Sequence, residues 1–456
     1  MLALAFALAS LSTPLLGDQP PEQEKSDLMK FMEQDYLLGT WGGGRPWLSE
    51  RGVDFEFFYI GSMPSVFSGG REKETVYQGL LAMTVDLDSK RLAGYEGGHF
   101  HVGGLWLHGE KPFSDAFIGD LNKVNLIDYP NGERLWELWY EQRFLGTNLS
   151  LKAGLMSVDQ DFIVPEVSSR IFVNQTFFFP TISFDVFDIP IYPTGFHGLP
   201  SSPLSSLGVK LRLDPCHSFY AQAAVYDGYP DMSRTGTRIN LNSEEGALSY
   251  FEAGYKVNQS PDSTGLPGTY KVGGWYHTDE FYDNYNSILA LSGVPGITAT
   301  THSGNYGVYA TADQMLYRET DASDPAKQGL GLFARGGWSP KDRNLVEWAI
   351  DGGLVYKGPF PSRDWDAFGV SAAWMWMSDD IARAQRTING FAPGTFSLVD
   401  YEGLLEFTYK AQLTAWWTLQ PSVQWVLHPG GSEDDFATAM DDRDAWAVIL
   451  MTTLRF

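Results

Sequence analysis

The sequence predicts an all-β protein: a transmembrane antiparallel β-barrel preceded by a short N-terminal helical segment outside the membrane. Three observations support this prediction. Aromatic residues are abundant although mean hydropathy is modest, apolar and polar residues alternate along most of the chain, and the last segment ends on an aromatic residue. At roughly 9–11 residues for each crossing strand plus turns and loops, the 456 residues accommodate about 16–18 strands.

Composition separates a barrel from a helical membrane protein. Aromatic residues make up 14% of the chain, yet the mean hydropathy is −0.20. A helical span needs about 20 consecutive apolar residues, and no such run follows residue 17. A barrel wall accounts for both values because each strand turns one face to lipid and the other to a wet lumen. The alternative from another class is a secreted soluble β-protein that binds or cleaves carbohydrate.

The acidic charge balance and the missing motifs exclude several functions. The net charge is −24, from 32 basic and 56 acidic residues, whereas nucleic-acid binding and phosphate pores depend on clustered cations. The sequence contains no Gly-x-Ser-x-Gly elbow, no His-Glu-x-x-His motif and no phosphate loop. We therefore expect no catalytic residue, no metal, no cofactor and no nucleic-acid partner.

Three regions follow one another along the chain. Residues 1–17 contain an apolar, Ala-rich run typical of a secretory signal, so we interpret them as the remnant of a signal peptide. Residues 18–50 are charged and partly helical in spacing, which predicts an N-terminal periplasmic segment. From residue 51 to 456 the period changes to two, and we expect a single transmembrane β-barrel that no helix-period segment interrupts.

The alternation recurs from one end of the barrel region to the other. In residues 149–155, leucine and alanine alternate with Ser150, Lys152 and a glycine, and residues 405–413 repeat the pattern. Turn signals such as Asp-Pro and Pro-Gly-Gly separate these segments. A meander of this length must close on itself or fold into a sandwich. Aromatic residues at the strand ends favour closure within a membrane.

The last segment, Asp444–Phe456, is the most specific single feature. Five apolar side chains share one of its faces: Trp446, Val448, Leu450, Leu454 and Phe456. A terminal aromatic residue after such alternation resembles the signal by which the barrel-assembly machinery recognises outer-membrane proteins. We therefore expect two partners for this segment: the assembly machinery, through Phe456, and the lipid of the outer membrane.

Several stretches resemble the OprB-type carbohydrate-selective porins. Leu37–Arg45 followed by Gly52–Phe55 resembles the family's entry into its first strand, and Arg134–Gln142 followed by Leu149–Gly154 resembles its characteristic hairpin. The resemblance continues in order to the end of the chain, through Gly268–His277, Asn305–Met315, Gly331–Arg335, Gly352–Pro359 and Leu419–Gln424.

This resemblance implies a barrel of sixteen strands with a narrowed lumen. It also implies passive diffusion of small sugars, monosaccharides such as glucose, across the outer membrane of a Gram-negative bacterium. A general porin or an organic-acid-selective porin on the same wall is the alternative within transport. The sequence leaves both a monomer and a homotrimer open.

Side chains on the expected lumen face are the candidates for contact with a sugar. Charged and amide groups match sugar hydroxyls, and aromatic faces cover the C–H faces of the ring. Lys152 follows Glu137 and Glu141 on the neighbouring strand, so cross-strand pairing with either is expected. Arg134 has the opposite parity from Glu137, which suggests a bulge or a strand end. The candidates are Arg134, Glu137, Trp139, Glu141, Arg143, Lys152, Lys210, Arg212, Trp275 and Arg335.

Overall fold

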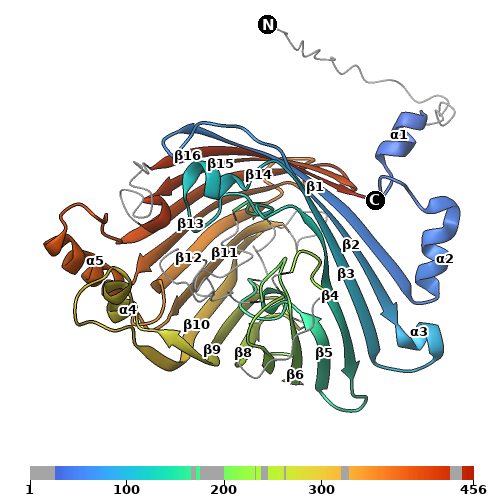
Figure 1. Cartoon of the computed structure of the whole chain (residues 1–456). Coiled ribbons are helices and arrows are strands. Elements are labelled where there is room, and N and C mark those ends of the chain that lie inside the picture. Colours follow the sequence, from blue (N-terminus) through green and yellow to red (C-terminus); the bar gives the residue numbers. More distant parts are fainter. Residues whose placement is uncertain are drawn as a thin grey trace, which may run out of the picture.

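A computed structural model of the chain describes residues 26–165, 171–174, 200–231, 233–237, 245–260, 263–319, 328–431 and 444–456. Sixteen antiparallel strands form one closed barrel, in which successive strands pair and the last strand pairs with the first (Figure 1). The predicted fold class and strand number are confirmed. The predicted signal remnant, residues 1–17, lies outside the described residues.

Strands that follow one another in the sequence are neighbours in the barrel. They are β1 (Val53–Ser68), β2 (Gln78–Asp88), β3 (Gly98–Gly109), β4 (Gly132–Arg143), β5 (Leu149–Met156), β6 (Ser206–Cys216), β7 (Phe219–Asp227), β8 (Ala247–Val257), β9 (Gly268–Tyr282), β10 (Thr301–Arg318), β11 (Gly329–Trp338), β12 (Val346–Lys357), β13 (Ala367–Met377), β14 (Tyr401–Thr414), β15 (Trp417–Leu427) and β16 (Ala445–Arg455). The α-helices are α1 (Asp27–Met32), α2 (Gly44–Glu50), α3 (Ser89–Ala93), α4 (Asn284–Leu291) and α5 (Asp379–Phe391). In the part of the chain that the structure describes, no helix has the length and apolar character needed to cross a membrane.

The two faces of the wall follow the alternation in the sequence. On β6, Val209, Leu211 and Leu213 are 49%, 45% and 44% exposed on the outer face, whereas Lys210 between them is 6% exposed. On β4, Leu138 is exposed and Glu137 is buried. A band of exposed apolar side chains around a closed barrel is the surface that lipid covers.

The two ends of the barrel differ in the length of their connections. At one end the connections are short, such as residues 217–218 between β6 and β7. The chain end after β16 lies at this end too, and α1 and α2 stand outside the wall beside it (Figure 1). At the opposite end most connections are longer, and two of them contain α4 and α5. Because outer-membrane barrels keep short turns in the periplasm and long loops outside, we refer to these as the periplasmic and outer ends.

The expectation that no helical segment interrupts the barrel region is wrong. Helices α4 and α5 pack against each other at the outer end. The Ser378 hydroxyl begins α5 by accepting hydrogen bonds from the N–H groups of Asp380 and Ile381, and α5 buries Ile381, Ala384 and Ile388 on one face. This spacing is helical. It is visible in the sequence, but it is short beside the many strand-period segments that surround it.

Candidate functional site

Three described stretches lie inside the barrel and cover part of its inner wall. They are residues 110–131, which connect β3 to β4, and residues 157–165 and 171–174, which belong to the connection between β5 and β6. We call them together the inner collar. The two connections touch, because the Leu126 N–H donates to the Val173 carbonyl oxygen at 2.7 Å. The inner collar narrows the lumen because it occupies space inside a closed wall.

Two buried glutamates on β14 hold the inner collar from one side. The carboxylate of Glu402 accepts the consecutive N–H groups of residues 121–122 at 2.8 and 2.7 Å. The carboxylate of Glu406 accepts those of residues 173–174 at 2.9 and 3.1 Å. Four backbone hydrogen bonds thus attach the two collar connections to one strand. They satisfy backbone donors that would otherwise be buried without partners.

A pair of lysines holds the collar from the other side. Lys152 on β5 lies opposite Lys210 on β6 in the strand register, and both ammonium groups contact the carboxylate of Asp161 in the collar. The Lys152 Nζ lies 2.9 Å from Asp161 Oδ2, and Lys210 binds the other oxygen. Like charges directly opposite each other destabilise a sheet. The negative charge of Asp161 therefore offsets the repulsion between the two lysines, and the same contacts attach the collar to the wall.

Ile163 of the inner collar has a strained backbone. Its φ is 60°, in the left-handed region that a β-branched residue rarely adopts. The surrounding wall holds both of its polar backbone groups: the N–H donates to Glu252 of β8 at 3.0 Å, and the carbonyl oxygen accepts from Arg335 of β11 at 3.3 Å. Lys271 of β9 donates to the next carbonyl oxygen, that of Val164, at 2.7 Å. Such strain persists only where neighbouring groups fix the conformation.

Four of the predicted candidates therefore contact the collar. Besides Lys152, Lys210 and Arg335, the buried Glu137 accepts the N–H of Ser157 at 3.1 Å. The strand register places Lys152 opposite Glu141, but its ammonium group binds Asp161. The expected cross-strand ion pair of Lys152 with Glu137 or Glu141 is therefore replaced by a contact with the collar.

Four other candidates are at least partly accessible on the inner face of the wall. Glu141 is half-buried and Arg143 is exposed. Arg212 donates to the Asp214 carboxylate at 2.9 Å from each of two nitrogens. Trp139 lies between the flanking strands, with the His101 ring centroid at 4.8 Å on β3 and the Lys152 Nζ at 4.1 Å on β5.

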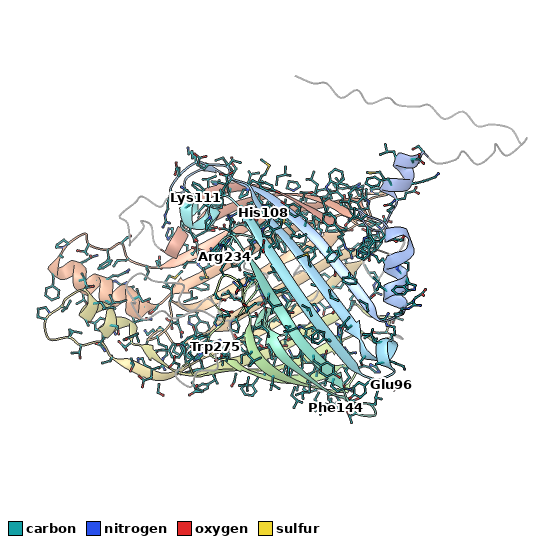
Figure 2. All side chains as sticks on the ribbon, turned by 45° about the vertical axis from the view of Figure 1, so that its right-hand side comes forward. Glu96, His108, Lys111, Phe144, Arg234 and Trp275 are labelled. Atoms are coloured by element: carbon teal, nitrogen blue, oxygen red, sulfur yellow. The ribbon has the colours of Figure 1, made fainter. Side chains whose placement is uncertain are left out.

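The last two candidates, Arg134 and Trp275, occupy different surroundings. Arg134 donates to the Asp231 carbonyl oxygen at 2.7 Å, and a shift in the β3–β4 register between Gly103 and Gly104 accounts for its parity, as a bulge would. Trp275 is 4% exposed within an apolar cluster, so it does not line an open lumen. Figure 2 labels Trp275 on the barrel and shows Glu96 and Phe144 together at the periplasmic end. His108, near the end of β3, and Lys111, just after that strand, lie toward the outer end.

Sequence reasoning missed the groups that attach the collar: Asp161, Glu252, Glu402 and Glu406. One signal for a covered inner wall was present. From Ala445 to Met451 both faces of the last strand are apolar, which indicates burial on two sides. The inward Ala447, Ile449 and Met451 indeed pack in an apolar cluster with collar residues such as Val124 and Ile127.

The comparison with protein families decides what this narrowed barrel is. The model described as "Carbohydrate-selective porin, OprB family" matches residues 72–456. The chain belongs to the OprB family. It is a carbohydrate-selective porin of the Gram-negative outer membrane and not an enzyme, as the sequence predicts. Membership of the OprB family also sets aside the secreted soluble β-protein.

Individual relatives agree with the OprB assignment. Porin B of Pseudomonas aeruginosa is 26% identical over 423 residues, which cover 88% of this chain and 88% of that protein. Among solved structures, the high-pH structure of Pseudomonas putida OprB has a TM-score of 0.80 at 24% identity, and it covers 93% of this chain and 99% of that chain. The low-pH structure of the same protein has a TM-score of 0.56 at 17% identity with the same coverage. At these identities the solved structures support the fold.

Proposed function

We propose that monosaccharides such as glucose diffuse passively through this porin, along a lumen that the inner collar narrows and that charged and aromatic side chains line. The observation that carries the proposal is the attachment of the collar. Carboxylates bind its backbone on the β14 side, and lysines bind Asp161 on the β5–β6 side. A collar fixed on both sides keeps a constant gap, and a constant gap selects solutes by size.

The partly accessible group on β4 to β6 is our candidate for contact with the sugar. Trp139 offers an aromatic edge on the same stretch of wall as the charged residues Glu141 and Arg143 of β4 and Arg212 of β6. Charged groups of both signs match hydroxyls that donate and accept hydrogen bonds. Contacts at a half-exposed site are weak, which suits a pore because tight binding would stop the flux. Glu137, Lys152, Lys210 and Arg335 act in this proposal by positioning the collar.

An organic-acid-selective pore is the main alternative, and it needs uncompensated cations along the path. The buried lysines at positions 152 and 210 share Asp161, and Arg212 pairs with Asp214. Arg335 pairs with Asp351 at 2.9 Å. Each of these four cations therefore contacts a carboxylate, and one carboxylate serves both lysines. This arrangement favours an uncharged solute over an anion.

Liposome swelling tests the proposal. We expect glucose to enter liposomes faster than an uncharged non-sugar solute of the same size. Glu141→Gln and Trp139→Ala should slow glucose and leave the non-sugar solute almost unchanged. Arg51→Gln is a matched control, because Arg51 contacts Trp47 within α2, outside the wall. Equal entry of the two solutes into wild-type liposomes would refute sugar selectivity.

We further propose that residues 1–17 direct export, that residues 18–50 stay on the periplasmic side and that residues 51–456 form the barrel. The strand that ends at Phe456 is then the segment that the barrel-assembly machinery binds. Phe456→Ala should lower the amount of heat-modifiable porin in the outer membrane, and an unchanged amount would contradict this role. Cross-linking in native membranes distinguishes a monomer from a homotrimer.

A further inference from the structure

We infer that Asp161 determines the charge preference of the pore: by compensating Lys152 and Lys210 it lets neutral sugars pass and disfavours sugar acids and other anions. The inference rests on the proposed sugar pathway, but it concerns the charge of the solute rather than recognition of its hydroxyls. It assigns a specificity-determining role to a carboxylate in a connection, outside the strands that carry the predicted candidates.

Lys152, Lys210 and Asp161 form a buried cluster of charges. The two lysines face each other in the β5–β6 register, and their side chains are 6% and 7% exposed. Each ammonium group takes one oxygen of the same carboxylate, whose side chain is 10% exposed. Charges interact more strongly in such a site than in bulk water, because the effective dielectric constant is lower. The cluster carries two positive charges and one negative charge.

The two lysines differ in the charged groups that would remain near them without Asp161. On one flank Glu141 lies opposite Lys152 in the β4–β5 register, so that carboxylate can take over Lys152. On the other flank Lys210 lies opposite Ala224, which has no charge to offer. The nearby Gln222, which donates its amide to the Asp161 backbone oxygen at 2.6 Å, is uncharged as well. The Glu252 carboxylate, which accepts from the same amide at 3.0 Å, is already occupied by three further donors: Tyr220, Tyr309 and the Ile163 N–H. Loss of the Asp161 charge therefore leaves Lys210 as the less compensated cation.

The charge of this cluster affects an ion that passes through the pore. The cluster lies on the inner wall, where the collar narrows the lumen, and an uncompensated cation at a narrow, low-dielectric point concentrates anions there. The solutes that gain are small anions and sugars that carry a carboxylate or a phosphate. Neutral sugars gain nothing from the same charge.

Planar-bilayer recordings in a KCl gradient test this directly. Asp161→Asn should raise the chloride-to-potassium permeability ratio by about threefold, the effect that one unit charge exerts on an ion at about 6 Å in a water-like dielectric. In liposomes, entry of gluconate should rise relative to entry of glucose. Asp161→Glu keeps the charge and should restore the wild-type ratio.

Two further variants separate charge from loss of collar structure. In Asp161→Asn combined with Lys210→Gln, the net charge of the cluster returns to the wild-type value, so the permeability ratio should return as well. Asp115→Asn is the control, because it removes a collar carboxylate that is 63% exposed and lies 3.3 Å from Lys123. It should shift the ratio by less than half as much.

Two results would overturn the inference. One is a permeability ratio for Asp161→Asn equal to that for Asp115→Asn, and the other is a double variant whose ratio stays shifted toward chloride. If Asp161→Asn does not assemble, Lys210→Gln alone tests the inference. This variant should shift the permeability ratio toward potassium. An unchanged ratio would refute the role of the cluster in charge preference. The proposed function fails by a different result, equal entry of glucose and the size-matched solute into wild-type liposomes.

Discussion

The guanidinium group of Arg45 binds the backbone oxygen of Phe456, the residue that follows β16. A second nitrogen of the same group donates to the Phe55 carbonyl oxygen of β1 at 3.0 Å. Beside it, the Leu37 N–H donates to the Arg455 carbonyl oxygen at 2.8 Å. The segment before the barrel thus bridges β1 and β16, the two strands whose pairing closes the wall.

The bridge predicts that Arg45→Gln weakens the closed barrel. Hydrogen bonds from a charged group contribute about 1.5–3 kcal/mol each, and these bonds need both strands in place. We therefore expect faster unfolding on heating, by about tenfold for each 1.4 kcal/mol lost, with little change in the rate of folding. Mobility on unboiled gels measures the unfolding rate after timed heating and the folding rate after timed refolding from denaturant. Arg51→Gln, which alters a contact within α2, should unfold like the wild type.

Glu406→Gln should loosen the inner collar and widen the pore. The substitution keeps the size of the side chain, but it replaces one of the two oxygens that accept the N–H groups of residues 173–174 with an amide donor. A buried unsatisfied donor costs about 1–3 kcal/mol. We expect higher single-channel conductance and faster entry of solutes larger than glucose. Glu56→Gln is the control, because Glu56 is exposed and meets Arg455 rather than the collar.

The left-handed backbone of Ile163 predicts an unusual order of stability. Glycine normally destabilises a strand relative to alanine, by roughly 0.5–1 kcal/mol. At Ile163, with φ at 60°, glycine relieves strain, so Ile163→Gly should be more stable than Ile163→Ala by about 1 kcal/mol. At the buried Ile449 of β16 the normal order should hold, with alanine the more stable. Denaturant unfolding of the four variants measures the two differences, and the same sign at both positions would contradict the argument.

Ser378→Ala should affect the outer rim without changing permeation. The Ser378 hydroxyl caps α5 and also donates to the Lys341 carbonyl oxygen at 2.5 Å. Loss of a serine cap costs about 1 kcal/mol. We expect faster proteolysis within residues 379–400 of the intact porin and unchanged entry of glucose. Slower glucose entry would show that α5 takes part in the pathway.

The wall could be predicted from the sequence because its cause is local. A period of two places Lys210 inside and its neighbours Val209 and Leu211 outside, and the structure has them so. The helix α5 was missed because 13 residues of helical spacing lie among strands of similar length. Local pattern alone therefore determines which face a residue takes, provided that the element type is right.

The inner collar could not be predicted in the same way. Glu402 and Glu406 have the spacing of lumen-facing residues, and they do face inward, but they meet backbone N–H groups 280 and 233 positions away in the sequence. Asp161 lies in a connection with no period to place it. For this reason Lys152 and Lys210 were predicted on the correct face, whereas their actual partner was not.

The attachment of the collar has a consequence for engineering. Its three stretches come from two connections, while the groups that hold it belong to strands elsewhere in the wall, such as β8, β11 and β14. The surface that meets lipid and the element that we propose selects the solute are therefore separable parts. Exchanging the two connections between related barrels should transfer permeation properties, provided that the recipient wall carries matching anchors.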